Sequence, residues 1–155
     1  QVVYVDKLES PGPLRMASAI GKIMPAHSTA LGKAMLAALP AKQVREILAA
    51  HGLTRRTANT ITDAGRFLDE LATVRARGYA IDNVENEEGI RCVGAPIMDH
   101  SGQVAGAVSL SGSTSSITLE RARRDLGPRV RETARQISRA MGWEGRLSVR
   151  EGRES

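Results

Sequence analysis

The chain has 155 residues, of which 41% are hydrophobic and 25% charged, and its formal net charge is +5. These values are typical of one globular domain and exclude a predominantly disordered chain. A single cysteine excludes an intrachain disulfide and fits a reducing cytoplasm, and no apolar run approaches the roughly 20 residues of a membrane helix. We therefore expect a cytoplasmic protein with no membrane partner.

The first half of the chain predicts strands followed by helices. Val2–Leu8 has strand composition and ends at the turn sequence SPGP, and residues 14–20 predict a second short strand. Either Ser28 or Thr29 can cap the next helix, which stops before Pro40. Because the chain begins at Gln1 inside a predicted strand and without methionine, we expect that an upstream part is missing.

Two more helices follow the first. One spans about 41–50 and ends at His51–Gly52. The other is capped by Thr62 or Asp63 and ends at Gly78, a residue suited to a helix C-terminus. Its apolar residues recur at helical spacing: Phe67, Leu68, Leu71 and Val74.

The second half predicts three strands and one long helix. The strands are Tyr79–Val84, Ile90–Met98 and Val104–Ser111, and the last two are joined by a hairpin turn with sequence DHSG. The helix spans Leu119–Met141, with a kink expected near Gly127–Pro128 because proline cannot donate a backbone hydrogen bond. Strands, helices, strands and a helix in this order predict an α+β fold with an antiparallel sheet.

The excess positive charge lies in the C-terminal part. From Leu119 to the end there are ten arginines and six acidic residues, whereas residues 1–118 are nearly neutral, with twelve basic and eleven acidic residues. The whole chain has only four aromatic residues, too few to stack on single-stranded nucleic acid. We therefore interpret the charge as a solvated helix face and expect that this domain alone does not read DNA.

Alternation along the last two strands separates two kinds of side chain. In Ile90–Met98, one face holds Cys92 and Gly94, and the other holds aliphatic residues. In Val104–Ser111, Ala105, Ala107, Ser109 and Ser111 share one face, while Val104, Val108 and Leu110 share the other. If the small faces align, side-chain volume is missing there. Either a helix packs closely against that face or a ligand fills the gap.

The helix that begins after Thr29 has an open N-terminus. No acidic residue occurs in its first turn, although free N–H groups and a partial positive charge gather there. Small or apolar side chains at Ala30 and Leu31 leave the backbone amides approachable. Such a terminus can bind a carboxylate, although water can equally satisfy the amides.

Several segments together resemble the effector-binding domain of the IclR-type bacterial transcriptional regulators. They are PAHSTALGKAMLAAL, TANTITD, ELATVRARGYAIDNVENEEGIRCVGAPIMDHSGQVAGAVSLSGS and ETARQISRAMG. The resemblance extends from about Val2 to Trp143 and implies a GAF-like fold, a twisted antiparallel sheet with helices on both faces. It also implies a winged helix-turn-helix DNA-binding domain before Gln1, assembly into homodimers or homotetramers, and a small-molecule effector.

The resemblance also implies a set of effector-binding residues. Polar contacts fall on Asp82, Cys92, Ser109 and Ser111, and the backbone amide donors on Ala30 and Leu31. The apolar wall falls on Met16, Met24 and Ile90. Smaller residues also occur in the family at the position of Leu31, whose bulk therefore reduces the expected pocket volume.

Cys92 itself allows four interpretations. As a nucleophile it needs a base or a cation beside it, and among His27, His51 and His100 only His27 can approach. As a metal ligand it lacks partners at suitable spacing, and we expect no metal and no cofactor. As a strand cysteine it can be inert core. The hydroxyls expected opposite it and the family pattern favour the fourth interpretation, a pocket lining.

The acidic run before Cys92 divides in two. Asp82 ends a strand and is expected to point toward a ligand. Asn83, Glu85, Glu87 and Glu88 are expected on a solvated connection, although Glu85 could cap a helix or gate the pocket.

We predict that residues 1–143 form a non-enzymatic sensor domain of a transcriptional regulator that binds a small organic acid. Residues 144–155 are expected to form a flexible tail. The alternatives are an enzyme domain that uses Cys92 or Ser109, and an oligomerisation module with a vestigial pocket.

Overall fold

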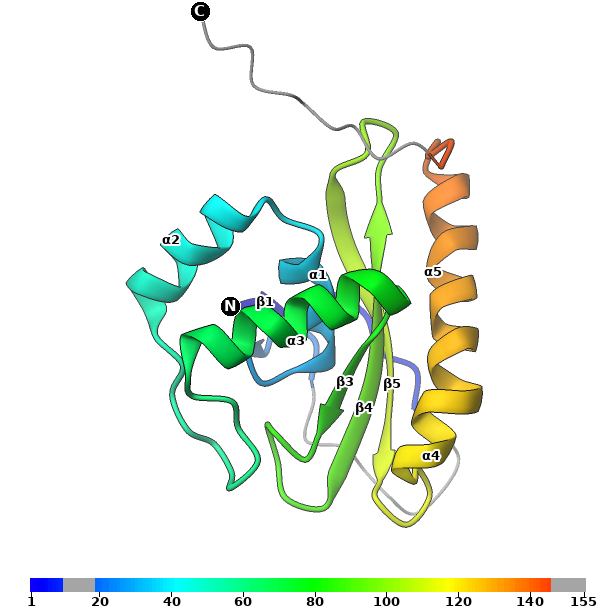
Figure 1. Ribbon diagram of the computed structural model, residues 1–155. Coiled ribbons are helices and arrows are strands. Elements are labelled where there is room, and N and C mark those ends of the chain that lie inside the picture. Colours follow the sequence, from blue (N-terminus) through cyan, green and yellow to red (C-terminus); the bar gives the residue numbers. More distant parts are fainter. Residues whose placement is uncertain (10–18, 146–155) are drawn as a thin grey trace, which may run out of the picture.

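A computed structural model describes residues 1–9 and 19–145. Its centre is a three-stranded antiparallel sheet in the order β3–β4–β5, made of β3 (Ala80–Asn83), β4 (Ile90–Met98) and β5 (Val104–Ser113). Helix α5 (Gly127–Ala140) packs on one face and helix α1 (Ala30–Ala37) on the other (Figure 1). The predicted α+β fold with helices on both faces is confirmed.

The face toward α5 is an apolar core. Val93 and Ala95 of β4 are completely buried there, together with Ile81 of β3 and Val130 and Ala134 of α5. Partly buried Ile97 and Val108 pack against this cluster. The face that alternation predicted to be aliphatic therefore builds this core. Leu110 on the same face of β5 is the exception, since it is 42% exposed.

The opposite face carries α1, α2 (Ala41–His51) and α3 (Ala64–Arg77), which enclose a second core around Phe67, Leu71 and Val74. The predicted caps are present. Thr29 Oγ1 accepts a hydrogen bond from the amide of Gly32 at 3.2 Å, and Asp63 Oδ1 accepts from the amide of Arg66 at 2.8 Å. Gly78 ends α3 with a φ of +81°, a conformation that glycine adopts without strain.

The N-terminal strands are shorter than predicted. Among the described N-terminal residues, 1–9 and 19–24, the strands are Val2–Val3 (β1) and Ile23–Met24 (β2), which pair as a separate two-stranded antiparallel sheet. The predicted strand Val2–Leu8 is therefore wrong beyond Val3. Strand-forming residues make a β-ladder only where a second strand pairs with them. Most of the strand predicted at 14–20 lies outside the described residues, and its last two residues are not in a strand.

The C-terminal helix contains a π-helical turn where the kink was predicted. Helix α4 (Leu119–Arg121) continues into a π-helical segment, Ala122–Leu126, and then into α5. In a π-helix each amide donates to the carbonyl five residues earlier, so the amide of residue 128 would donate to the carbonyl of Arg123. Residue 128 is proline, which has no N–H. The hydroxyl of Tyr79 donates to that carbonyl instead, at 2.9 Å.

Gly127 allows the Tyr79 ring to lie against this turn, since a Cβ at Gly127 would overlap the ring.

The last ten residues of the tail predicted at 144–155 lie outside the described residues. Within the described part of the chain, no helix is long and apolar enough to cross a membrane.

Candidate ligand-binding site

Strand register places the polar side chains of the sheet in one row. Asp82 of β3 lies opposite Cys92 of β4, and Cys92 lies opposite Ser111 of β5. In the neighbouring row, Gly94 lies opposite Ser109. Directly opposed residues of antiparallel strands share a face, so the small faces predicted from alternation do align across the hairpin.

Helix α1 fills part of the missing volume with its own backbone. A Cβ added to Gly94 would lie 2.9 Å from the carbonyl carbon and oxygen of Ala30 and 3.1 Å from the amide nitrogen of Leu31. Glycine at this position therefore lets the first turn of α1 lie directly on the sheet. Of the two outcomes expected for the small face, close helix packing is realised at Gly94.

The first amides of α1 remain available for hydrogen bonding. Thr29 caps the amide of Gly32, but the amides of Ala30 and Leu31 have no hydrogen-bond partner in the described part of the chain. No acidic side chain occurs in the first turn. The helix thus presents two free donors beside the row of Cys92 and Ser111.

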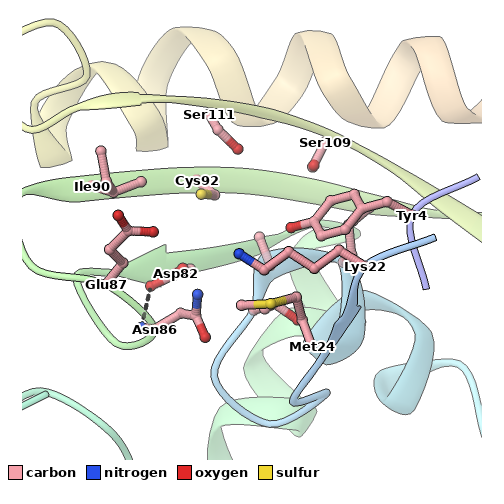
Figure 2. Close-up of a pocket in the computed structure, with 13 residues that line it drawn as sticks. Tyr4, Lys22, Met24, Asp82, Asn86, Glu87, Ile90, Cys92, Ser109 and Ser111 are labelled. Carbon is pink, nitrogen blue, oxygen red and sulfur yellow. Dashed lines mark hydrogen bonds between the residues drawn. The ribbon is translucent and has the colours of Figure 1, made fainter. Parts of the chain in front are cut away.

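A cavity of about 30 Å³ lies between α1, the sheet and the segment around β1 and β2. Of the nine residues expected to bind a ligand, all except Met16 line it, and Met16 lies outside the described residues. In Figure 2 Cys92, Ser109 and Ser111 lie along β4 and β5, with Asp82 and Met24 below them in the view. The small face is thus partly covered by helix and partly left as a cavity.

Sequence reasoning missed five residues of the cavity wall: Tyr4, Lys22, Thr29, Asn86 and Glu87. Tyr4 and Lys22 are brought together by the N-terminal pairing, in which the amide of Tyr4 donates to the carbonyl of Lys22 at 3.1 Å. In Figure 2 their side chains extend from the N-terminal segment toward Cys92 and Asp82. No local pattern identifies them, since their place depends on how this segment folds over the sheet.

Asp82 is held at the base of the cavity by backbone donors. Its side chain is almost fully buried, and Oδ1 accepts hydrogen bonds from the amides of Glu85 at 2.7 Å and Asn86 at 3.3 Å. Burial raises the pKa of Asp82 to about 7, because the loss of solvation outweighs the stabilising amides and the nearby Lys33. Near neutral pH the group can therefore either donate or accept a proton in a hydrogen bond.

The electrostatics exclude a reactive thiolate at Cys92. Burial first, and then the charge of Asp82, raise the pKa of the thiol to about 12. His27 cannot act as its base, because His27 lies outside the cavity wall and its Nε2 is 2.9 Å from the carbonyl of Thr54. Within residues 1–9 and 19–145, no group of three or more His, Cys, Asp or Glu side chains could hold a metal ion.

The solvated connection predicted for 83–88 is wrong at Glu85. Glu87 and Glu88 are exposed, but Glu85 is only 5% exposed, and its Oε1 accepts from Lys33 Nζ at 2.7 Å. Lys33, which no sequence pattern singled out, is completely buried. Glu85 therefore does not line the cavity beside Cys92. It borders a separate cavity of about 480 Å³, whose wall also includes Arg66 and Arg123.

Together, the fold and the cavity are those of a GAF-like domain, in which a candidate ligand site lies between one face of an antiparallel sheet and a helix. Residues 1–139 match the family model described as bacterial transcriptional regulator IclR C-terminal. The chain belongs to this family. The predicted identity as an IclR-type domain and the predicted GAF-like fold are confirmed.

Individual relatives agree with the family match. The HTH-type transcriptional regulator KdgR of Escherichia coli is 39% identical over 142 residues, which are 92% of this chain and 54% of that protein. The crystal structure of the Thermotoga maritima IclR matches with a TM-score of 0.86 and 42% identity, covering 91% of this chain and 57% of that chain. The chain thus spans about half the length of the curated relatives it matches.

A second related structure contains a ligand. It is a double mutant of the PobR inducer-binding domain from Acinetobacter in complex with 3-hydroxybenzoic acid. It matches with a TM-score of 0.74 and 28% identity, covering 84% of this chain and 76% of that chain. All these relatives are regulators, so the predicted class, a regulatory domain and not an enzyme, is confirmed.

Proposed function

We propose that this domain senses a small organic acid that also carries a hydroxyl or carbonyl group. The observation that carries the proposal is the arrangement of donors in one cavity. Ala30 and Leu31, whose amides are free, line the same cavity as Ser109 and Ser111. A carboxylate accepts hydrogen bonds from both kinds of donor, and the helix N-terminus contributes roughly 0.3–1 kcal/mol to binding an anion there.

Asp82 supplies the preference for a hydroxylated acid. With a pKa of about 7, it can accept a hydrogen bond from a ligand hydroxyl when ionised or donate one to a ligand oxygen when protonated. Lys22 adds a positive charge to the cavity wall, which also favours an anion. The complex of the related PobR domain with 3-hydroxybenzoic acid supports this assignment, because that ligand has a carboxylate and a hydroxyl.

The size of the cavity sets a further requirement. A volume of about 30 Å³ has room for two or three water molecules, at about 10–15 Å³ of such volume for each. An acid with several heavy atoms therefore needs part of the wall to move. Because α1 is packed on Gly94, we expect the wall to move on the other side, where Tyr4 and Lys22 lie.

We also propose that the signal passes to an attached DNA-binding domain in a cytoplasmic regulator. The relatives are named HTH-type regulators, and the chain spans about half of their length. We expect homodimers or homotetramers, which sedimentation of the domain can test. The domain alone should bind DNA weakly and without sequence preference, because its surplus charge lies in the C-terminal part.

A melting-temperature screen with (S)-lactate and propionate tests the proposed ligand class, since the two acids differ only in a hydroxyl. An acid at 100 times its Kd should stabilise the domain by about 2.7 kcal/mol. Ser109→Ala and Ser111→Ala should each weaken binding by about 0.5–3 kcal/mol. Asp82→Ala should reduce the affinity for lactate more than that for propionate. Preference for a neutral or cationic metabolite over every acid tested would refute the proposal.

A further inference from the structure

Lys33 is buried on α1 without touching the candidate cavity. Lysine is almost never fully buried unless it is paired. Here its Nζ donates to the carbonyl of Ile81 at 2.5 Å, to Glu85 Oε1 at 2.7 Å and to Glu70 Oε1 at 3.3 Å. All three acceptors lie outside α1, and none of these four residues lines the cavity beside Cys92. The ammonium therefore fastens α1 to the end of β3 and to the loop that follows.

The segment Asp82–Asn86, which runs from the end of β3 into that loop, has a strained backbone. Val84 has a φ of +61°, which is rare for a β-branched residue. Glu85 spans the loop, because its Oε1 also accepts from the amide of Asn83 at 3.2 Å while its own amide donates to Asp82 Oδ1. The carbonyl of Glu85 accepts from Thr60 Oγ1 at 2.7 Å. Glu85 is thus bound at both ends, to Lys33 and to the carboxyl group of Asp82.

We infer that the buried Lys33–Glu85 ion pair is the positioning element of the ligand site, and that it holds the Asp82–Asn86 segment on α1 so that the Asp82 carboxyl group faces the cavity. The inference rests on the proposed function, since it concerns how that same site is built. Neither residue touches a ligand in the cavity. Both act through Asp82.

The two members of the pair act on Asp82 in opposite directions. The positive charge of Lys33 lowers the pKa of Asp82, and the negative charge of Glu85 raises it. Among the residues that the structure describes, the other titratable or charged groups that line the cavity with Asp82 are Tyr4, Lys22, Glu87 and Cys92. A variant that removes one charge of the pair leaves these four in place. The ion pair therefore influences the pKa of Asp82 as well as the orientation of its carboxyl group.

This opposition gives a test that a purely structural role would fail. The titration of the Asp82 carboxyl carbon is followed by NMR in the wild-type domain, in Glu85→Gln, in Lys33→Met and in the double variant. We expect the midpoint to fall in Glu85→Gln and to rise in Lys33→Met. If Lys33→Met does not fold, because Glu85 is left buried and unpaired, the double variant is compared with Glu85→Gln alone. Its midpoint should lie higher, because the two differ only at Lys33.

The conservative variant Lys33→Arg, which keeps the charge, should restore a midpoint near the wild-type value. The pH midpoint of (S)-lactate affinity should move in the same direction as the Asp82 midpoint in each variant. Midpoints that stay fixed, or that move together in both single variants, would overturn the inference. If wild-type protein binds neither lactate nor propionate, the proposed function fails, but the titration without acid still decides the role of the pair.

Discussion

The two faces of the central sheet differ although they are built from alternate residues of the same strands. Toward α5, Val93 and Ala95 are completely buried in an apolar cluster. Toward α1, the neighbours Cys92 and Gly94 border a helix terminus with free amides, a small cavity and a carboxyl group with a raised pKa. One face thus uses its side chains for packing, whereas the other keeps polar groups with unused hydrogen-bonding capacity. Adjacent residues of β4 therefore contribute to different things, one to the stability of the core and the next to the candidate binding site.

The largest expected difference between the faces is in their response to pH. An unfolded aspartate ionises near pH 4, whereas folded Asp82 keeps its proton up to about pH 7. Between these values the native state binds more protons, so stability falls as pH rises. The ionisation of Asp82 lowers the free energy of unfolding by at most about 4 kcal/mol over this range, at about 1.36 kcal/mol for each pH unit.

Asp82→Asn keeps the acceptor for the amides of Glu85 and Asn86 but cannot ionise. In urea denaturation, it should therefore become more stable relative to wild type between pH 5 and pH 8. Val93 and Ala95, on the other face, contribute nothing to this slope. Parallel pH dependences in the variant and wild type would mean that Asp82 has no raised pKa.

A second comparison sets Gly94 against Gly106. A methyl group at Gly94 would press on the backbone of Ala30 and Leu31, so Gly94→Ala should cost about 1–3 kcal/mol and weaken acid binding by displacing the amides. Gly106→Ala on β5 meets nothing within 4 Å and should change stability by less than about 0.5 kcal/mol. Thermal unfolding of both variants decides the point, and equal losses would argue against the close approach of α1.

A third contrast comes from adding a hydroxyl to each face of β4. Val93→Thr introduces a hydroxyl into a fully buried apolar site and should cost about 1–3 kcal/mol. Cys92→Ser places one beside Ser111 in the polar row and should change stability by less than about 0.5 kcal/mol. Acid binding should persist in Cys92→Ser, as expected of a wall residue. Loss of binding there, with the fold intact, would show that the sulfur itself is required.

Local patterns predicted much of this arrangement. The period of two along β4 and β5 assigned Val93 and Cys92 to opposite faces, since side-chain direction in a strand depends only on parity. Helix caps at Thr29 and Asp63 were predictable because the capping contact spans three residues.

Long-range contacts were not predictable from local patterns. Lys33 and Glu85 are 52 positions apart, and each alone resembles an ordinary solvated charge. Tyr4 and Lys22 enter the cavity wall only because an N-terminal segment folds over the sheet. The strand predicted for Val2–Leu8 was too long for the same reason, since pairing depends on which partner is within reach.

The π-helical turn before α5 has a consequence for how the sequence can change. Pro128 leaves the carbonyl of Arg123 without an amide donor, the hydroxyl of Tyr79 supplies one, and Gly127 leaves space for the ring. Replacement of Tyr79 by phenylalanine is harmful beside Pro128 but becomes tolerable once residue 128 regains an N–H group. The effects of substitutions at these three positions are therefore non-additive, and the three residues are constrained to vary as a set.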